Sequence, residues 1–212
     1  MILISHPRAG TEWFFDCIRP NDFVRWEIFG RALYNKHERP LIPSLHMTVD
    51  QKTQVIASNI GSHKIMLGPL LEEASPNHFV LDHLRERDDV YLLRRRNVRS
   101  AFLSLQIAAY NNFNFHGDNR TITKSFAIKR DAIDRWHYGM HEVFNEDHGF
   151  NYQEQFWYED LLAGMLPQTL NFNPNRTQRP RRNSLQYQHL ITNLDEVIHW
   201  MDELGTPGNL ET

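Results

Sequence analysis

The chain has 212 residues, of which 41% are hydrophobic and 23% charged, and this is enough apolar sequence for one domain with a substantial core. The formal net charge of −3 argues against a protein whose main role is to coat nucleic acid. Cys17 is the only cysteine, which excludes an internal disulfide and a thiolate metal site and fits a reducing compartment.

No run of about eighteen apolar residues, the length that a membrane helix needs, occurs in the sequence. The chain also lacks a basic segment followed by an apolar stretch at its start. We therefore expect a soluble, cytoplasmic protein that forms a single domain over residues 1–212 and binds neither membranes nor nucleic acid.

The first predicted elements are a strand, a tight loop and a helix. An apolar run over residues 2–4 ends in a cluster of Pro, Arg, Gly and Thr, after which Trp13, Phe14, Cys17 and Ile18 have the spacing of one helix face. The backbone N–H groups and the positive dipole end at such a helix start bind anions, and Arg8 adds a full charge. The pattern predicts a phosphate or sulfate site; the alternative is a corner with a solvated arginine.

Later segments alternate between strand and helix patterns. Strands are predicted at 23–30, 63–68, 89–94 and 155–158, and helices at 77–87, 97–109, 124–145 and from Asn193 onward. Segments 31–62, 110–122 and 167–184 are predicted to be mostly loop, the first with room for one short helix. The alternation predicts an α/β fold with a central parallel sheet flanked by helices.

Two asparagines are predicted to cap helices. Asn97 precedes a helical pattern in which Ser100 and Ser104 continue one polar line on the same side. Asn193 stands before the last helix with Glu196 three residues later, which is the spacing of a capping box.

Three arginines, Arg94–Arg96, end the predicted strand 89–94. An arginine at the carboxyl end of a parallel strand faces the ligand crevice, and Ser104 can donate to the same anion. The register leaves Arg94 and Arg95 open: because side chains alternate along a strand, Arg94 and Arg96 could share the ligand side while Arg95 faces elsewhere. The alternative is a solvated, salt-bridged edge. Together with the first loop, however, the arginines suit a nucleoside with a phosphate at each end.

The loop Pro7-Arg8-Ala9-Gly10-Thr11-Glu12-Trp13 resembles the 5′-phosphosulfate loop of the sulfotransferase family, Pro-Lys/Arg-Ser-Gly-Thr-Thr/Ser-Trp/Phe. It departs from that pattern at Ala9 and Glu12. In this family a serine follows eight residues after the arginine that binds the 3′-phosphate, as Ser104 follows Arg96. The resemblance implies a P-loop-like fold that binds 3′-phosphoadenosine 5′-phosphosulfate (PAPS) through these residues. Trp13 then either stacks on adenine or belongs to the core.

The resemblance also implies a reaction. The sulfuryl group of PAPS passes to a hydroxyl of a carbohydrate or small metabolite, and adenosine 3′,5′-bisphosphate (PAP) is released. Arg8 stabilises the charge on the leaving 5′-phosphate, and Lys64 resembles the strand lysine that precedes the acceptor pocket. No metal is required for this transfer.

Glu27 is the candidate general base. Trp26-Glu27-Ile28-Phe29 resembles the segment that holds the base in small bacterial members, and apolar neighbours raise a carboxyl pKa toward neutrality. An ordinary edge-strand carboxylate is the alternative. In the histidine-bearing branch of the family the base occupies the position of Met66, so that assignment fails here. His46 and His116 are the further candidates.

Weaker resemblances cover the later part of the chain. Residues 158–161, Tyr-Glu-Asp-Leu, match a mostly structural family motif. Arg179, Arg181 and Arg182 fit either a phosphate-binding segment or a disordered basic loop. Two other functions stay open at this point: a non-catalytic nucleotide-binding protein of the same fold, and a divergent P-loop nucleotide kinase, although a Walker A loop does not fit residues 7–13.

Overall fold

The computed structural model describes residues 1–6, 8–18, 23–27, 29, 47–58, 62–74, 78–111, 123–139, 147–176 and 184–208. The side chains at 12, 23–27, 72–73, 176 and 184–185 are outside this description. The chain forms two compact units, one of Met1–Arg94 with Glu146–Gln178 and the other of Arg95–Asn145 with Arg179–Thr212. The expectation of a single domain over 1–212 stays a prediction.

The first unit contains a five-stranded sheet in the order β2-β3-β1-β4-β5. Its strands are β1 (Ile2–Ser5), β2 (Phe23–Glu27), β3 (Ser62–Met66), β4 (Val90–Arg94) and β5 (Tyr152–Trp157). All four pairings between these strands are parallel. The predicted α/β fold with a central parallel sheet is therefore confirmed.

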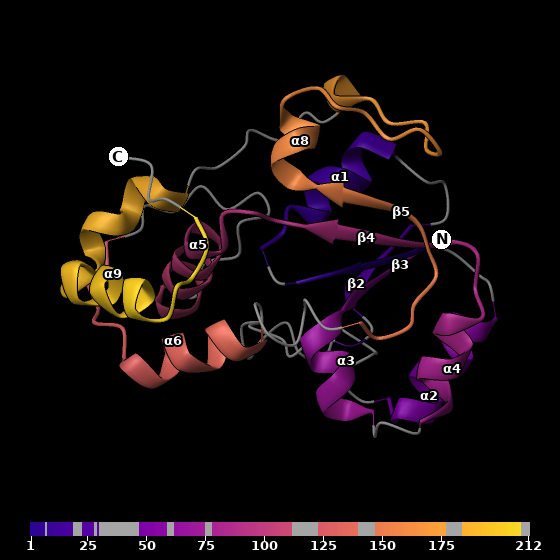
Figure 1. The fold of residues 1–212 in the computed structure, drawn as a ribbon, viewed down its shortest axis with the longest axis horizontal. Coiled ribbons are helices and arrows are strands. Elements are labelled where there is room, and N and C mark those ends of the chain that lie inside the picture. Colours follow the sequence, from indigo (N-terminus) through magenta and orange to yellow (C-terminus); the bar gives the residue numbers. More distant parts are fainter. Residues whose placement is uncertain are drawn as a thin grey trace. The chain divides into compact units, whose positions relative to one another are not determined.

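Helices cover both faces of this sheet (Figure 1). The helix α1 (Thr11–Ile18) and the short helix α8 (Tyr158–Leu162) lie on one side. On the other side lie α2 (Val49–Ala57), α3 (Leu67–Glu73) and α4 (Phe79–Arg85). Because both faces are covered, every residue of β1 and β3 is buried. The apolar run Ile2-Leu3-Ile4 of β1 is typical of a buried parallel strand, whereas β3 buries the polar residues Ser62, His63 and Lys64.

The core on the α1 side forms around two phenylalanines of that helix, Phe14 and Phe15. Strand residues Leu3, Tyr91 and Leu93 pack against them. The cluster also contains Ala9, Cys17, Phe156, Leu161 and Phe172. The residues that form the first loop and the residues that form this core are thus neighbours in the sequence.

One predicted boundary in the first unit is corrected, and one expected helix is found. The strand predicted at 63–68 ends at Met66, and α3 begins at once with Leu67. Gly68-Pro69 was expected to end a strand, but proline fits the first turn of a helix, where its missing N–H is not needed. The short helix for which 31–62 left room is α2, which Thr48 caps: its Oγ1 accepts from Gln51 N (3.2 Å), and Gln51 Oε1 accepts from Thr48 N (2.8 Å).

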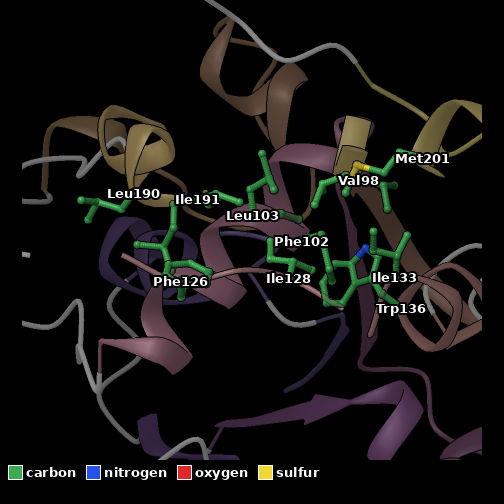
Figure 2. Close-up of a cluster of buried hydrophobic side chains, with 13 residues drawn as sticks. Val98, Phe102, Leu103, Phe126, Ile128, Ile133, Trp136, Leu190, Ile191 and Met201 are labelled. Carbon is green, nitrogen blue, oxygen red and sulfur yellow. The ribbon is translucent and has the colours of Figure 1, made fainter. Parts of the chain in front are cut away.

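The second unit consists of α5 (Val98–Tyr110), α6 (Arg130–His137), the 3₁₀ helix η5 (Ser184–Leu190) and α9 (Leu194–Glu203). Its apolar cluster brings Val98, Phe102 and Leu103 of α5 together with Ile133 and Trp136 of α6 (Figure 2). Met201 of α9 and residues 190–191 complete it.

The helix predicted at 124–145 begins only at Arg130. Phe126 instead forms an isolated bridge with Ile191, because its N–H donates to Leu190 O (3.0 Å) and its carbonyl accepts from Thr192 N (2.9 Å). Phe126 is buried in the same cluster as the helix residues. Its place in the apolar pattern therefore reflects burial and not helical backbone.

Both asparagines occupy the predicted N-cap positions, but only Asn97 caps its helix through its side chain. Asn97 Oδ1 accepts from Ser100 N at 3.0 Å, at the start of α5. Asn193 precedes α9 but makes no side-chain cap bond, so the predicted capping box is wrong. The Asn193 side-chain amide instead binds the backbone of Ile128: Asn193 Oδ1 accepts from Ile128 N, and Asn193 Nδ2 donates to Ile128 O, both at 2.9 Å. Among the described residues, no helix has the length and apolar character to cross a membrane.

Candidate functional site

The strand order defines a switch point between β1 and β4. From β1 the chain continues to β2 on one side of the sheet, and from β4 it continues to β5 on the other. Open parallel sheets bind ligands outside the carboxyl ends of the strands at such a point. Ser5 is paired with Leu93, so the loop after β1 and the arginine at the end of β4 begin at the same edge of the sheet.

The loop after β1 contains two left-handed residues. Arg8 has φ 64° and Gly10 has φ 84°. Of the described residues other than glycine, only Arg8 has a positive φ, so two of the three residues before α1, Arg8 and Gly10, are left-handed. Turns that include left-handed residues form concave sites in which backbone N–H groups bind anions.

The start of α1 adds to this arrangement. Thr11 is the first residue of the helix, and Gly10 O accepts from Phe14 N at 2.9 Å. The first N–H groups of a helix have no carbonyl partner within it, and its dipole is positive at this end. The loop and the first helical turn therefore offer backbone donors and positive potential in one place, three residues after Arg8 in the sequence.

Packing holds the loop in this conformation. Ala9 and Thr11 are buried, and His6 O accepts from Ala9 N at 3.3 Å. A Cβ atom on Gly10 would collide with ring carbons of Tyr158, the first residue of α8. Gly10 is therefore required both by its φ and by the close approach of the tyrosine ring.

Trp13 is half-buried and makes two edge-on ring contacts. Its ring centroid lies 5.6 Å from that of Tyr158 and 5.5 Å from that of Phe172, and it packs against the α1-side core. Of the two roles expected for Trp13, these contacts describe the core role. Stacking on adenine stays a prediction.

Arg94 and Arg96 do not share a strand. β4 ends at Arg94, so strand alternation does not extend to Arg96, and a shared ligand side for the two arginines stays a prediction. The Arg94 guanidinium lies over the Trp157 ring, 5.6 Å from its centroid, where Arg94 is paired with Trp157 in the sheet. Arg96 is exposed and Ser104 is buried on α5, both in the second unit.

The candidate catalytic residues Glu27 and Lys64 are brought side by side by the sheet. They are register partners in β2 and β3. Lys64 is 3% exposed, and a buried ammonium requires polar partners or a neighbouring anion. Met66, the last residue of β3, accepts a hydrogen bond at its sulfur from Ser5 Oγ (3.6 Å) and offers no acid–base chemistry.

Several predicted residues lie outside the described part of the chain. These are Pro7, the side chains of Glu12 and Glu27, and His46, His116, Arg179, Arg181 and Arg182. Among the residues that the structure describes, no group of three His, Cys, Asp or Glu side chains is arranged to hold a metal ion.

Sequence reasoning missed the contribution of β5 to this edge of the sheet. Tyr158 contacts the loop, and Trp157 contacts Arg94; the only signal was the run of aromatic residues that ends the strand. Burial raises the pKa of Tyr152, at the other end of β5, to about 12 against the opposing charge of Arg94. This phenol stays neutral at physiological pH and is not a candidate base.

Comparisons of the chain with protein-family models, with curated proteins and with solved structures found no match. The assignment of a function therefore depends on the conformation and the sequence of the loop after β1 and on the strand ends beside it.

Proposed function

We propose that the protein is a sulfotransferase that moves the sulfuryl group of PAPS to a hydroxyl of a carbohydrate or small metabolite. The observation that carries the proposal is the loop at the carboxyl end of β1, in which Arg8 and Gly10 are left-handed and after which α1 begins at Thr11. This loop offers backbone donors and a permanent cation to a phosphate.

The composition of the loop favours a phosphosulfate over a nucleoside triphosphate. A Walker A loop has a Lys and a Ser or Thr after its last glycine, whereas Thr11 and Glu12 follow Gly10 here. Arg8 stays charged at every physiological pH and recognises phosphate oxygens in pairs. Arg96 and Ser104 are assigned to the 3′-phosphate on the sequence resemblance alone.

In the proposed reaction the acceptor oxygen attacks sulfur while the bond between sulfur and the 5′-phosphate oxygen breaks. Arg8 and the N–H groups of Gly10 and Thr11 stabilise the negative charge that develops on the leaving phosphate. Glu27 accepts the proton of the attacking hydroxyl. A lysine beside a carboxylate favours its ionised form, so we assign Lys64, the register partner of Glu27, to keeping this base charged.

The experiment measures PAP binding by calorimetry and transfer of labelled sulfuryl from PAPS to a panel of hydroxyl acceptors. We expect PAP to bind in the absence of Mg²⁺ and more tightly than ATP with Mg²⁺. Arg8→Ala is expected to lower transfer by about 10²–10³-fold, the cost of losing one donor to a developing oxyanion. Glu27→Gln is expected to lower transfer but to leave the dissociation constant of PAP unchanged.

The matched control is Arg135→Ala, which removes an arginine whose side chain is 74% exposed on α6 and should leave binding and transfer unchanged. A Mg²⁺-dependent preference for ATP would point to a nucleotide kinase instead. Binding of PAP without transfer to any acceptor would point to a non-catalytic nucleotide-binding protein.

A further inference from the structure

The segment after α9, Thr206–Gly208, lies against the start of α5. Gly205 has φ 64°, and it ends α9 in a Schellman turn in which Gly205 N donates to Asp202 O (3.0 Å) and Thr206 N to Met201 O (2.9 Å). This turn directs the carboxyl-terminal segment toward residues 97–99. Thr206 is 1% exposed, so the segment is packed and does not trail into solvent.

Arg99 joins this segment to α5. Its backbone N donates to Pro207 O at 3.2 Å, and its Nε donates to Thr206 O at 2.7 Å. Its Nη1 also forms an ion pair with Asp202 Oδ1 at 2.6 Å. Thr206 Oγ1 lies 3.0 Å from His137 Nδ1 of α6. The segment is thus fixed from several sides before it reaches Gly208.

Gly208 then meets Asn97 directly. Gly208 has φ 111°, and a Cβ atom there would collide with Asn97 Oδ1 and lie 2.8 Å from Asn97 Cα. Asn97 is the cap of α5, because its Oδ1 accepts from Ser100 N. Only glycine allows the segment to approach the cap this closely without moving it.

The contact between Gly208 and Asn97 affects the position of Arg96 more than that of Ser104. Arg96 precedes the helix and is exposed, and its carbonyl accepts from Val98 N at 3.0 Å, so its position depends on the turn that Asn97 closes. Ser104 lies within α5, whose position is set by the buried side chains of Ala101 and Phe102. A displaced Asn97 moves the arginine and leaves the serine in place.

We propose that Gly208 is a positioning residue that holds Arg96, through Asn97, in the place from which it binds the 3′-phosphate of the nucleotide. This inference rests on the proposed function, which assigns Arg96 and Ser104 to that phosphate. The carboxyl-terminal segment then acts on the 3′-phosphate end of the nucleotide only.

The test compares the dissociation constants of PAP and of adenosine 5′-monophosphate, measured by calorimetry on the full chain. Their ratio reports the contribution of the 3′-phosphate. In Gly208→Ala we expect the affinity for PAP to fall about tenfold, the value of one charge-assisted hydrogen bond, and the affinity for the monophosphate to stay unchanged. A variant that is merely less stable would not change the ratio.

The matched control is Gly164→Ala, outside this segment. Gly164 is also left-handed, but a Cβ atom built there has no neighbour within 4 Å beyond the adjoining residues, so this variant has backbone strain without the collision and should keep the ratio of the wild type. If Gly208→Ala does not fold, Arg99→Lys provides the second test. It keeps the charge but loses the Nε–H that donates to Thr206, and we expect the ratio to fall about threefold.

An unchanged ratio in a folded Gly208→Ala or Arg99→Lys variant would overturn the positioning role and leave the proposed function standing. A wild-type protein that binds PAP no more tightly than the monophosphate would overturn both this inference and the assignment of Arg96. A wild-type protein that binds neither nucleotide would overturn the proposed function itself.

Discussion

At the scale of single residues, Arg8 combines the charge that the proposed reaction uses with an unfavourable backbone conformation. A left-handed conformation costs a residue with a Cβ about 1–2 kcal/mol, and the buried neighbours Ala9 and Thr11 hold the loop in place against this cost. Strain of this kind persists where the surrounding structure enforces it, and it is concentrated at functional sites. Arg8 is thus a position at which stability and activity are expected to have opposite requirements.

This conflict can be measured by comparing Arg8→Gly with Arg8→Ala. Both variants lose the guanidinium and are expected to lose transfer equally, but only glycine relieves the left-handed strain. We therefore expect the free energy of unfolding, from urea titrations, to be about 1 kcal/mol higher for Arg8→Gly than for Arg8→Ala.

Arg96 is the matched control, because it is exposed and has no positive φ. At Arg96 the order of stabilities should reverse: Arg96→Gly should be less stable than Arg96→Ala by about 0.4–1 kcal/mol, because glycine raises the entropy of the unfolded chain. Equal stabilities of the two Arg8 variants would contradict the strain described for the loop.

Local sequence signals predicted the residues of the loop and the cap at Asn97, because each signal lies within a few positions of the chain. They did not predict that Tyr158 packs on Gly10 or that Gly208 packs on Asn97. Contacts between residues so distant in sequence leave no local pattern. Asn193 shows the converse, since the backbone of Ile128 competes successfully for the amide that was expected to cap α9.

At the scale of elements, Asp89 connects three of them. Arg87 forms a two-pronged pair with its carboxylate, through Nε at 2.6 Å and Nη2 at 2.7 Å, while Arg87 Nη1 donates to Ile56 O in α2 at 3.2 Å. The amino group of Met1 lies 3.0 Å from Asp89 Oδ2, and Ile2 N donates to the Asp89 carbonyl. The entry to β4 is thus tied to α2 and to the start of β1.

These contacts predict a pH dependence of stability. Burial opposes ionisation of Asp89, but the hydrogen bonds and charges of the amino terminus and Arg87 outweigh it and lower the pKa to about 2. The carboxylate therefore stabilises the fold fully above the unfolded pKa of about 4, and this contribution is lost as the pH falls from about 4 to about 2.

Asp89→Asn is expected to lower the free energy of unfolding by about 1–2 kcal/mol at pH 7, a value reduced for solvent screening because the side chain is 34% exposed. Urea unfolding at pH 7 and at pH 2.5 should show this difference shrink at the lower pH. Asp82→Asn removes an exposed ion pair with Arg85 and should change stability by less than about 0.5 kcal/mol at both pH values. A constant loss for Asp89→Asn would exclude the ionised pair as its cause.

Strands were predicted better than the helix expected at 124–145, because buried parallel strands are short apolar runs between turn signals. Val90 to Arg94 is such a run, and it forms β4 as expected. The apolar spacing from 124 onward included Phe126, whose burial has a different origin from that of Ile133 and Trp136. Periodicity records which side chains are buried, and it cannot separate a helix from a bridged segment that enters the same core.

At the scale of the whole molecule, the sequence predicted a parallel sheet but not its strand order. Order depends on which distant strands pair, and β1 pairs with both β3 and β4. Only this order identifies the edge between β1 and β4 as the switch point. The residues of the first loop were thus available from the sequence, whereas their topological position required the structure.

Nucleotide binding is expected to stabilise the whole fold. At a concentration of PAP one hundred times its dissociation constant, linkage adds about 2.7 kcal/mol to the free energy of unfolding, which raises the melting temperature of a chain of this size by about 5–10 °C. The shift measured at a fixed PAP concentration should decrease as salt is added, because screening weakens contacts between phosphate and arginine. Adenosine without phosphates is the control, and an equal shift with adenosine would contradict a phosphate-directed site.

The central place of β1 also bears on how the protein is made. A ribosome completes this strand well before it completes the segments that flank it on either side, β3 and β4. During that interval the hydrophobic segment Ile2-Leu3-Ile4 has no partner strand and is exposed to other nascent chains. We therefore expect newly made protein to depend on chaperones until translation has passed Arg94, the end of β4.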